Sequence, residues 1–154
     1  MTSEAPSAAT GGLVLFAYDG SELAGVAIEE AARQLPPGRE AIVLCVWQPA
    51  DVGFLPVGGR HLHAMDAGEV RAAAEETAEY GASLAVRAGF RAHALAVEAA
   101  PAWEGIISAA DERRAGLIVL GSRRHSGLIG HLLGSVSSAV LDHAGCCVLI
   151  VHTR

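Results

Sequence analysis

Short apolar runs alternate along the chain with longer stretches in which apolar residues recur every three or four positions. The runs have the length and character of strands buried in a sheet, and they cover residues 13–18, 41–47, 90–97, 117–120 and 147–152. The stretches between them have the spacing of helices that bury one face, and they cover residues 22–35, 67–86, 101–114 and 136–143. Strands that alternate with helices form parallel sheets, because a crossover helix returns the chain to the same edge. The pattern predicts an α/β fold, a doubly wound open sheet of five mainly parallel strands flanked by four helices.

Residues that favour turns separate several of these elements. Ser21 is suited to cap the first helix, Gly89 to end the second, and Ala115-Gly116 to end the third. The stretch 49–67 is rich in glycine and proline and contains no clear element. Connections of this length usually carry function or are mobile.

Length and composition indicate one folded domain. The chain has 154 residues, of which 51% are hydrophobic. Residues 1–11 are small and polar, so we expect a disordered leader before a single domain at 12–154. The first residues lack the basic and apolar regions of a signal peptide, and no apolar run is long enough to span a membrane. We therefore expect a cytoplasmic protein without a membrane partner.

Charge and cysteine content argue against several functions. The net charge is −6 and the chain has no lysine, which argues against non-specific nucleic-acid binding and excludes a Walker-type phosphate loop. Three cysteines without a CxxC pair indicate reduced thiols and no zinc site. His61 and His63 lie two residues apart in the long glycine-rich stretch, where solvent exposure is a better expectation than metal binding. We expect no metal site built from protein side chains alone.

The stretch 117–138 carries the most specific chemistry. A predicted strand reaches Gly121, a polar cationic segment containing Arg124 follows, and Gly134-Ser135 precedes a predicted helix. A helix N-terminus offers unpaired N–H groups and partial positive charge, glycine lets backbone approach a ligand, and serine adds a donor. This combination suits a phosphate group.

Asp19 follows the first predicted strand, at the edge of the sheet that Gly121 also reaches. Its carboxylate could accept hydrogen bonds from a ribose, or hold Mg²⁺ through water. Asp-Gly-Ser is equally common as a turn, so both interpretations stay open.

These segments together resemble the universal stress protein family. The family carries Gly-x-x-Gly, nine residues, and then Gly-Ser or Gly-Thr. This chain has Gly121, then Arg124 in place of the second glycine, then nine residues and Gly134-Ser135. Residues 13–21 are similar to the family's opening strand and turn, and residues 143–151 to its closing strand. The likeness covers nearly the whole chain from Leu13.

The resemblance implies a Rossmann-like fold of the adenine nucleotide alpha hydrolase type. It also implies a regulatory stress-response module that binds ATP or AMP, with or without Mg²⁺, and forms a homodimer through its C-terminal strand. The implied nucleotide-binding residues are Ala17, Tyr18, Asp19, Val46, Leu120, Gly121, Arg124, Gly134, Ser135, Val136 and Ser137.

Arg124 leaves an alternative open. Its side chain could fill the phosphate space, or its guanidinium could pair with a phosphate. If it blocks the site, the chain would be a dimer that binds no nucleotide and acts through a protein partner. A ligase of the wider adenine-binding group is ranked last, because Asp19-Gly20-Ser21 stands where such enzymes carry a Ser-Gly-Gly-type loop. Slow ATP hydrolysis is the most catalysis that we expect.

Overall fold

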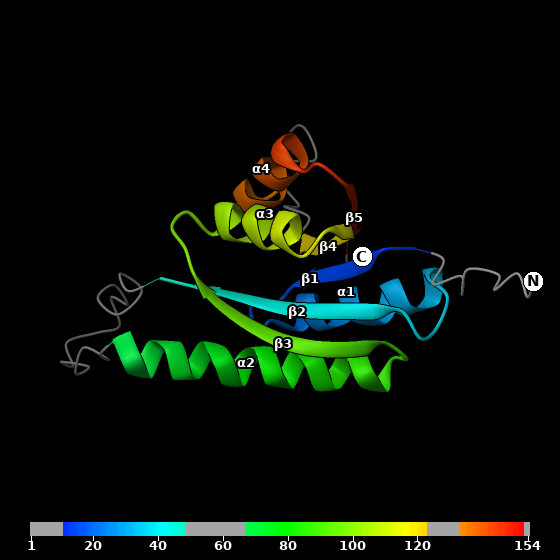
Figure 1. Ribbon diagram of the computed structural model, residues 1–154, viewed down its shortest axis with the longest axis horizontal. Helices are drawn as coiled ribbons and strands as arrows, with labels where there is room; N and C mark the ends of the chain where they lie inside the picture. Colours follow the sequence, from blue (N-terminus) through cyan, green and yellow to red (C-terminus); the bar gives the residue numbers. More distant parts are fainter. Residues whose placement is uncertain (1–10, 49–66, 123–132, 153–154) are drawn as a thin grey trace, which may run out of the picture.

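The computed structural model describes residues 11–48, 67–122 and 133–152, and it consists of a sheet between two layers of helices (Figure 1). In chain order the elements are β1 (Leu13–Ala17), α1 (Glu22–Gln34), β2 (Glu40–Trp47), α2 (Ala67–Arg87), β3 (Arg91–Glu98), α3 (Ala102–Glu112), β4 (Ala115–Ser122), α4 (Ser135–His143) and β5 (Cys147–His152). The predicted alternation of strands and helices is confirmed.

The order of the strands reverses once. The sheet runs β3-β2-β1-β4-β5, and every neighbouring pair is parallel, so the predicted sheet is confirmed and is parallel throughout. The chain builds outward from β1 to β3 and then returns to add β4 and β5 on the other side of β1. The reversal therefore lies between β1 and β4. Ligand sites in open parallel sheets form at such a point, outside the carboxyl ends of the strands.

Helices cover both faces of the sheet, with α1 and α2 on one side and α3 and α4 on the other (Figure 1). Side chains of β1 alternate between them: Val14 and Phe16 pack with α1 and α2, whereas Leu15 packs with α3 and α4. All three are at most 1% exposed. Burying each such side chain contributes about 1.5–3 kcal/mol, which explains why the strands appear as continuous apolar runs.

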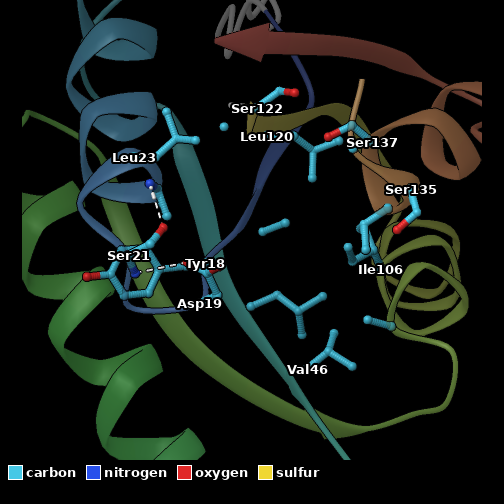
Figure 2. Close-up of a pocket in the computed structure, with 17 residues that line it drawn as sticks. Tyr18, Asp19, Ser21, Leu23, Val46, Ile106, Leu120, Ser122, Ser135 and Ser137 are labelled. Atoms are coloured by element: carbon cyan, nitrogen blue, oxygen red, sulfur yellow. Dashed lines mark hydrogen bonds between the residues drawn. The ribbon is translucent and has the colours of Figure 1, made fainter. Parts of the chain in front are cut away.

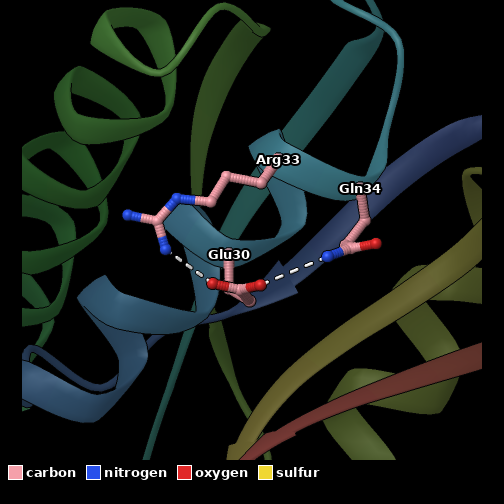
Figure 3. Close-up of polar contacts among 3 residues, drawn as sticks. All are labelled: Glu30, Arg33 and Gln34. Atoms are coloured by element: carbon pink, nitrogen blue, oxygen red, sulfur yellow. Dashed lines mark hydrogen bonds and ion pairs between the residues drawn. The ribbon is translucent and has the colours of Figure 1, made fainter.

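Polar contacts occupy the outer face of α1 (Figure 3). The Glu30 carboxylate accepts hydrogen bonds from Arg33 (2.7 Å) and Gln34 (3.2 Å), and these two bonds lower the pKa of Glu30. Exposed pairs of this kind contribute little to stability. The orientation of α1 is instead determined by its buried face, formed by Ala24, Ala27, Ile28 and Ala31.

Two predicted helix boundaries are confirmed. The Ala24 N–H donates to the Ser21 side chain (3.2 Å), so Ser21 caps α1 as predicted. Gly89 follows α2 with a φ of 108°, a conformation that favours glycine.

The predicted boundary between α3 and β4 is wrong. Helix α3 ends at Glu112, Arg114 takes the left-handed turn with a φ of 52°, and Ala115 already belongs to β4. Gly116 does not end a helix; a Cβ there would lie 3.2 Å from the Cα of Gly12. It is a glycine because two backbones meet at that point, which its sequence neighbours do not reveal.

No helix in the described part of the chain is long and apolar enough to cross a membrane. The three cysteines are free thiols, with Cys45 buried and Cys147 exposed.

The Tyr18 ring is part of the core between the sheet and α2. A Cβ added at Gly81 of α2 would lie 2.7 Å from the ring, so the glycine makes room for the tyrosine. Burial raises the pKa of Tyr18 above its ordinary value of 10.0, and the nearby Tyr80 and Asp19 raise it further. The folded state therefore favours the neutral phenol.

We predict that Tyr18→Phe makes folding less sensitive to alkaline pH. Because the folded-state pKa of Tyr18 is raised, its contribution to stability is complete below the unfolded pKa and is lost as pH rises through the folded pKa. Urea unfolding should show the wild type losing more stability than Tyr18→Phe between about pH 9 and pH 11. Tyr80→Phe should reduce the loss much less than Tyr18→Phe, because Tyr80 is 59% exposed and adds to the raised pKa of Tyr18 only after burial. If wild type and Tyr18→Phe lose the same unfolding free energy over this pH range, the raised pKa assigned to Tyr18 is contradicted.

Candidate functional site

A cavity of about 480 Å³ opens at the carboxyl ends of β1 and β4, where the strand order reverses (Figure 2). The ends of β1, β2 and β4 and the first residues of α1, α3 and α4 all contribute to its walls. Segments more than a hundred positions apart in the sequence thus meet at one site.

Ten of the eleven residues implied by the resemblance line this cavity. They are Ala17, Tyr18, Asp19, Val46, Leu120, Gly121, Gly134, Ser135, Val136 and Ser137. The eleventh, Arg124, lies outside the described residues, as do its cationic neighbours Arg123 and His125.

One end of the cavity is apolar. Val46, Ile106 and Leu120 point toward the same space from three different elements (Figure 2). Leu44 and Ala102 also line it, and with Ile106 they were missed by sequence reasoning. An apolar residue on a buried element looks the same in sequence whether it faces the core or a cavity, so no sequence signal could have identified them.

Backbone groups of β2 also face this end. The Tyr18 N–H donates to the Leu44 carbonyl (2.8 Å), one residue beyond the end of β1. Alternate residues of a strand direct their N–H and C=O groups to the same side. The backbone of Val46 therefore points past the end of β1, into the space where a planar ligand could use both a donor and an acceptor.

Another part of the cavity wall is formed by the N-terminus of α4. Gly134 is the N-cap and offers no side chain to cap the helix, and the bond from the Ser138 N–H to the Gly134 carbonyl (2.9 Å) begins the helical ladder. The N–H groups of residues 135–137 precede that bond, so the helix itself offers them no acceptor. The hydroxyls of Ser135 and Ser137 lie beside them (Figure 2). This end can donate several hydrogen bonds to an anion.

The two glycines of the motif have different structural roles. A Cβ at Gly121 would lie 2.8 Å from Leu23 Cγ and 3.0 Å from the Leu23 carbonyl oxygen. Gly121 therefore lets α1 approach β4. This close packing is enough by itself to require a glycine at position 121.

Gly134 has no such requirement. Its φ of −57° and ψ of 157° suit any residue, and a Cβ there would meet no atom of the described residues within 4 Å. Helix N-caps are usually Ser, Thr, Asp or Asn, each of which would satisfy an unpaired N–H. The described residues leave room for such a side chain at Gly134, and glycine supplies no cap from this position.

Asp19 forms a turn, and its carboxylate is also exposed at the cavity. The Ser21 N–H donates to Asp19 Oδ1 (2.9 Å), so the turn interpretation is realised. Asp19 lines the cavity as well, which makes the turn and a ligand contact compatible. The adjacent Tyr18 ring points away toward α2 (Figure 2), so Tyr18 lines the site mainly with its backbone.

Ser122 at the end of β4 is a lining residue that the sequence analysis did not assign to the site. It is 3% exposed, and its Oγ has no hydrogen-bond partner in the part of the chain that the structure describes. Buried hydroxyls in folded proteins nearly always have a hydrogen-bond partner, so Ser122 adds a polar group to the cavity wall. The sequence feature that could have identified Ser122 is its position directly after Gly121, the glycine that closes the predicted strand.

Charge at the cavity is sparse. Asp19 is the one charged side chain among the described residues that line it. Across residues 11–48, 67–122 and 133–152, no group of three or more His, Cys, Asp or Glu side chains is placed to hold a metal ion. Backbone N–H groups and serine hydroxyls are therefore the main donors that this part of the chain presents.

Comparison with known proteins agrees with this architecture. The profile of the Universal stress protein family matches residues 13–152. Universal stress protein YxiE of Bacillus subtilis is 32% identical over 149 residues, which cover 90% of this chain and 97% of that protein.

Solved structures share the fold at lower identity. A universal stress protein in complex with cAMP superposes with a TM-score of 0.63 at 22% identity, covering 94% of this chain and 98% of that one. The Archaeoglobus fulgidus universal stress protein in complex with dAMP gives 0.58 at 20% identity, covering 91% and 96%. The family profile spans nearly the whole chain, and the curated relative is similar along its full length. This chain therefore belongs to the universal stress protein family.

Proposed function

We propose that this protein is a regulatory module that binds ATP or AMP in the cavity between β1 and β4. The observation that carries the proposal is the N-terminus of α4, which has a glycine at its N-cap and lines the same cavity as a group of apolar side chains. The described complexes of two universal stress proteins, with cAMP and with dAMP, support an adenine nucleotide as the ligand class.

The adenine base is assigned to the apolar end. Ala17, Val46 and Leu120 offer flat apolar contact, and the Val46 backbone offers a donor and an acceptor to the edge of the base. A purine has both an apolar face and such an edge. The ligand pocket thus combines apolar burial with a few directional polar groups, as small-molecule sites generally do.

The phosphates are assigned to the N-terminus of α4. Backbone N–H groups of Ser135, Val136 and Ser137 would donate to phosphate oxygens, and the helix dipole would favour their negative charge. Gly121 and Gly134 would let the backbone come close. Arg124 would pair with the outer phosphates, in place of the second glycine of the family motif.

The ribose and any metal are assigned to Asp19. Its exposed carboxylate could accept from ribose hydroxyls, or hold a phosphate-bound Mg²⁺ through water. One carboxylate is too few to bind Mg²⁺ without the phosphates, so the metal would arrive with the nucleotide. The proposed role is regulatory binding, with slow ATP hydrolysis as the upper limit of catalysis.

We predict that Ser135→Ala weakens ATP and AMP binding by roughly ten- to a hundredfold. A hydrogen bond to a charged group is worth about 1.5–3 kcal/mol, and its loss converts to that range of affinity. Calorimetric titration of the purified protein, with and without Mg²⁺, measures the change. Adenosine lacks phosphate, so its affinity should change far less. Ser83→Ala, on α2 and remote from the cavity, should leave all affinities unchanged.

A second candidate function is a dimer that binds no nucleotide and acts through a protein partner. Arg124 favours it, because a side chain replaces the family's second glycine. Arg124→Gly separates the two: the variant should gain ATP affinity if Arg124 blocks the site and lose it if Arg124 pairs with phosphate. If wild type and Arg124→Gly both fail to bind millimolar ATP, the nucleotide proposal is wrong and the partner-binding function replaces it.

We further propose that the protein forms a homodimer through β5. This strand lies at the edge of the sheet, and Val148, Leu149 and Ile150 in it are only half-buried. The neighbouring Leu141 of α4 is 44% exposed. Pairing with β5 of a second copy across a two-fold axis would cover both the strand edge and these apolar groups.

We predict a mass in light scattering of twice the 15.8 kDa of one chain. Ile150→Lys should shift the protein to the monomer, because the charge would be buried at the two-fold interface. His93→Lys places the same residue on the opposite edge strand, β3, and should leave the dimer intact. A wild-type monomer at micromolar concentration would contradict the proposal.

A further inference from the structure

A groove separate from the β1–β4 cavity lies between β3 and α3. Strand β3 is at the opposite edge of the sheet from β5. Helix α3 packs on β2 and β4, so it leaves the outer part of the same face uncovered over β3, with a cavity of about 350 Å³. The floor is formed by Leu95 and Val97, both half-buried, and one wall by Ala109 of α3. This apolar floor is accessible in the described part of the chain.

The rim of the groove is acidic. Glu104, Ser108 and Glu112 follow one another at intervals of four residues, so they form one exposed row along α3 above the floor. Neither glutamate takes part in the ion pairs found among the described residues. Arg113 is the one cation among the described residues that line the groove, and it directly follows Glu112 as the C-cap of α3.

The edge of the sheet beside this groove is open to pairing. Strand β3 has 8 residues, contains no proline and is the outermost strand of the sheet on this side. Alternate residues of such a strand direct N–H and C=O groups away from the sheet. An extended peptide can add to such an edge, with its backbone giving affinity and its alternate side chains giving specificity.

The charges select the kind of partner. A second copy of this chain, which has a net charge of −6, would place the same acidic rim against itself across a two-fold axis. We propose that the β3–α3 groove instead binds an extended segment of another protein, in which an apolar residue is flanked two positions away on each side by Lys or Arg.

The spacing of the rim fits that pattern. Glu104 and Glu112 are eight residues apart, or about 12 Å along the helix. Two basic residues four positions apart on an added strand are separated by about 13 Å, and both point to the same face. The apolar residue between them points to that face as well, and it would lie beside Leu95 and Val97 at the spacing of neighbouring strands, about 4.8 Å. One added strand can therefore extend the apolar floor and direct both basic residues toward the glutamates.

The test uses the whole protein and a fluorescein-labelled peptide of sequence TKTLTKT, with TETLTET as its charge-reversed control. Fluorescence polarisation should show binding of the first peptide with a Kd below about 1 mM, and no binding of the second. The double variant Glu104→Gln/Glu112→Gln should weaken binding roughly three- to thirtyfold, as expected for two exposed ion pairs. Backbone amide shifts should concentrate in β3 and α3.

A matched variant controls for overall charge. Glu76→Gln/Glu79→Gln removes two exposed carboxylates from α2, on the other face of the sheet, and should leave peptide affinity within about twofold. The proposal is overturned if neither peptide binds, if both bind equally, or if the α2 variant weakens binding as much as the α3 variant. Amide shifts centred on β5 or on the β1–β4 cavity would also overturn it. Thermal unfolding of both variants confirms that each is folded.

Discussion

The site depends on the contact between Leu23 of α1 and Gly121 of β4. Because the strand order reverses between β1 and β4, α1 passes beside a strand that comes a hundred residues later in the chain. The contact leaves no room for a Cβ at Gly121, where one would lie 2.8 Å from Leu23 Cγ. A larger residue would push α1 away from β4 at a cost of about 1–3 kcal/mol and would reshape the cavity. This glycine is explained by the packing of the fold.

Gly134 presents the opposite case. Its backbone conformation, and the lack of any described residue within 4 Å of a Cβ placed there, would accept a capping serine or aspartate, which would stabilise α4 by about 1 kcal/mol. The residue that would best stabilise α4 is therefore not the residue that is present at this position. Mismatches of this kind concentrate at functional sites. An uncapped N-terminus keeps its N–H groups available to an anionic ligand, which is the basis of the proposed nucleotide site.

Much of the fold could be predicted because buried parallel strands are continuous apolar runs and because Ser21 and Gly89 mark helix ends. The polar residues that line the cavity could be predicted because Gly134 and Ser135 belong to a motif with fixed spacing and Asp19 directly follows the first predicted strand. The apolar half could be predicted only in part: the resemblance implied Ala17, Val46 and Leu120, whereas Leu44 and Ile106 carry no mark that separates a cavity wall from a core. The α3–β4 boundary was misplaced because Gly116 serves a backbone contact with Gly12, a residue distant in sequence.

The most direct test of the central claim is to measure stability and AMP affinity together in Gly134→Asp. The account predicts a more stable protein, by about 0.5–1 kcal/mol in urea unfolding, because aspartate would cap α4 and complement its dipole. It also predicts loss of AMP binding with adenosine affected less, because the carboxylate would occupy and repel the phosphate position. Unchanged AMP affinity in the stabilised variant would contradict the account.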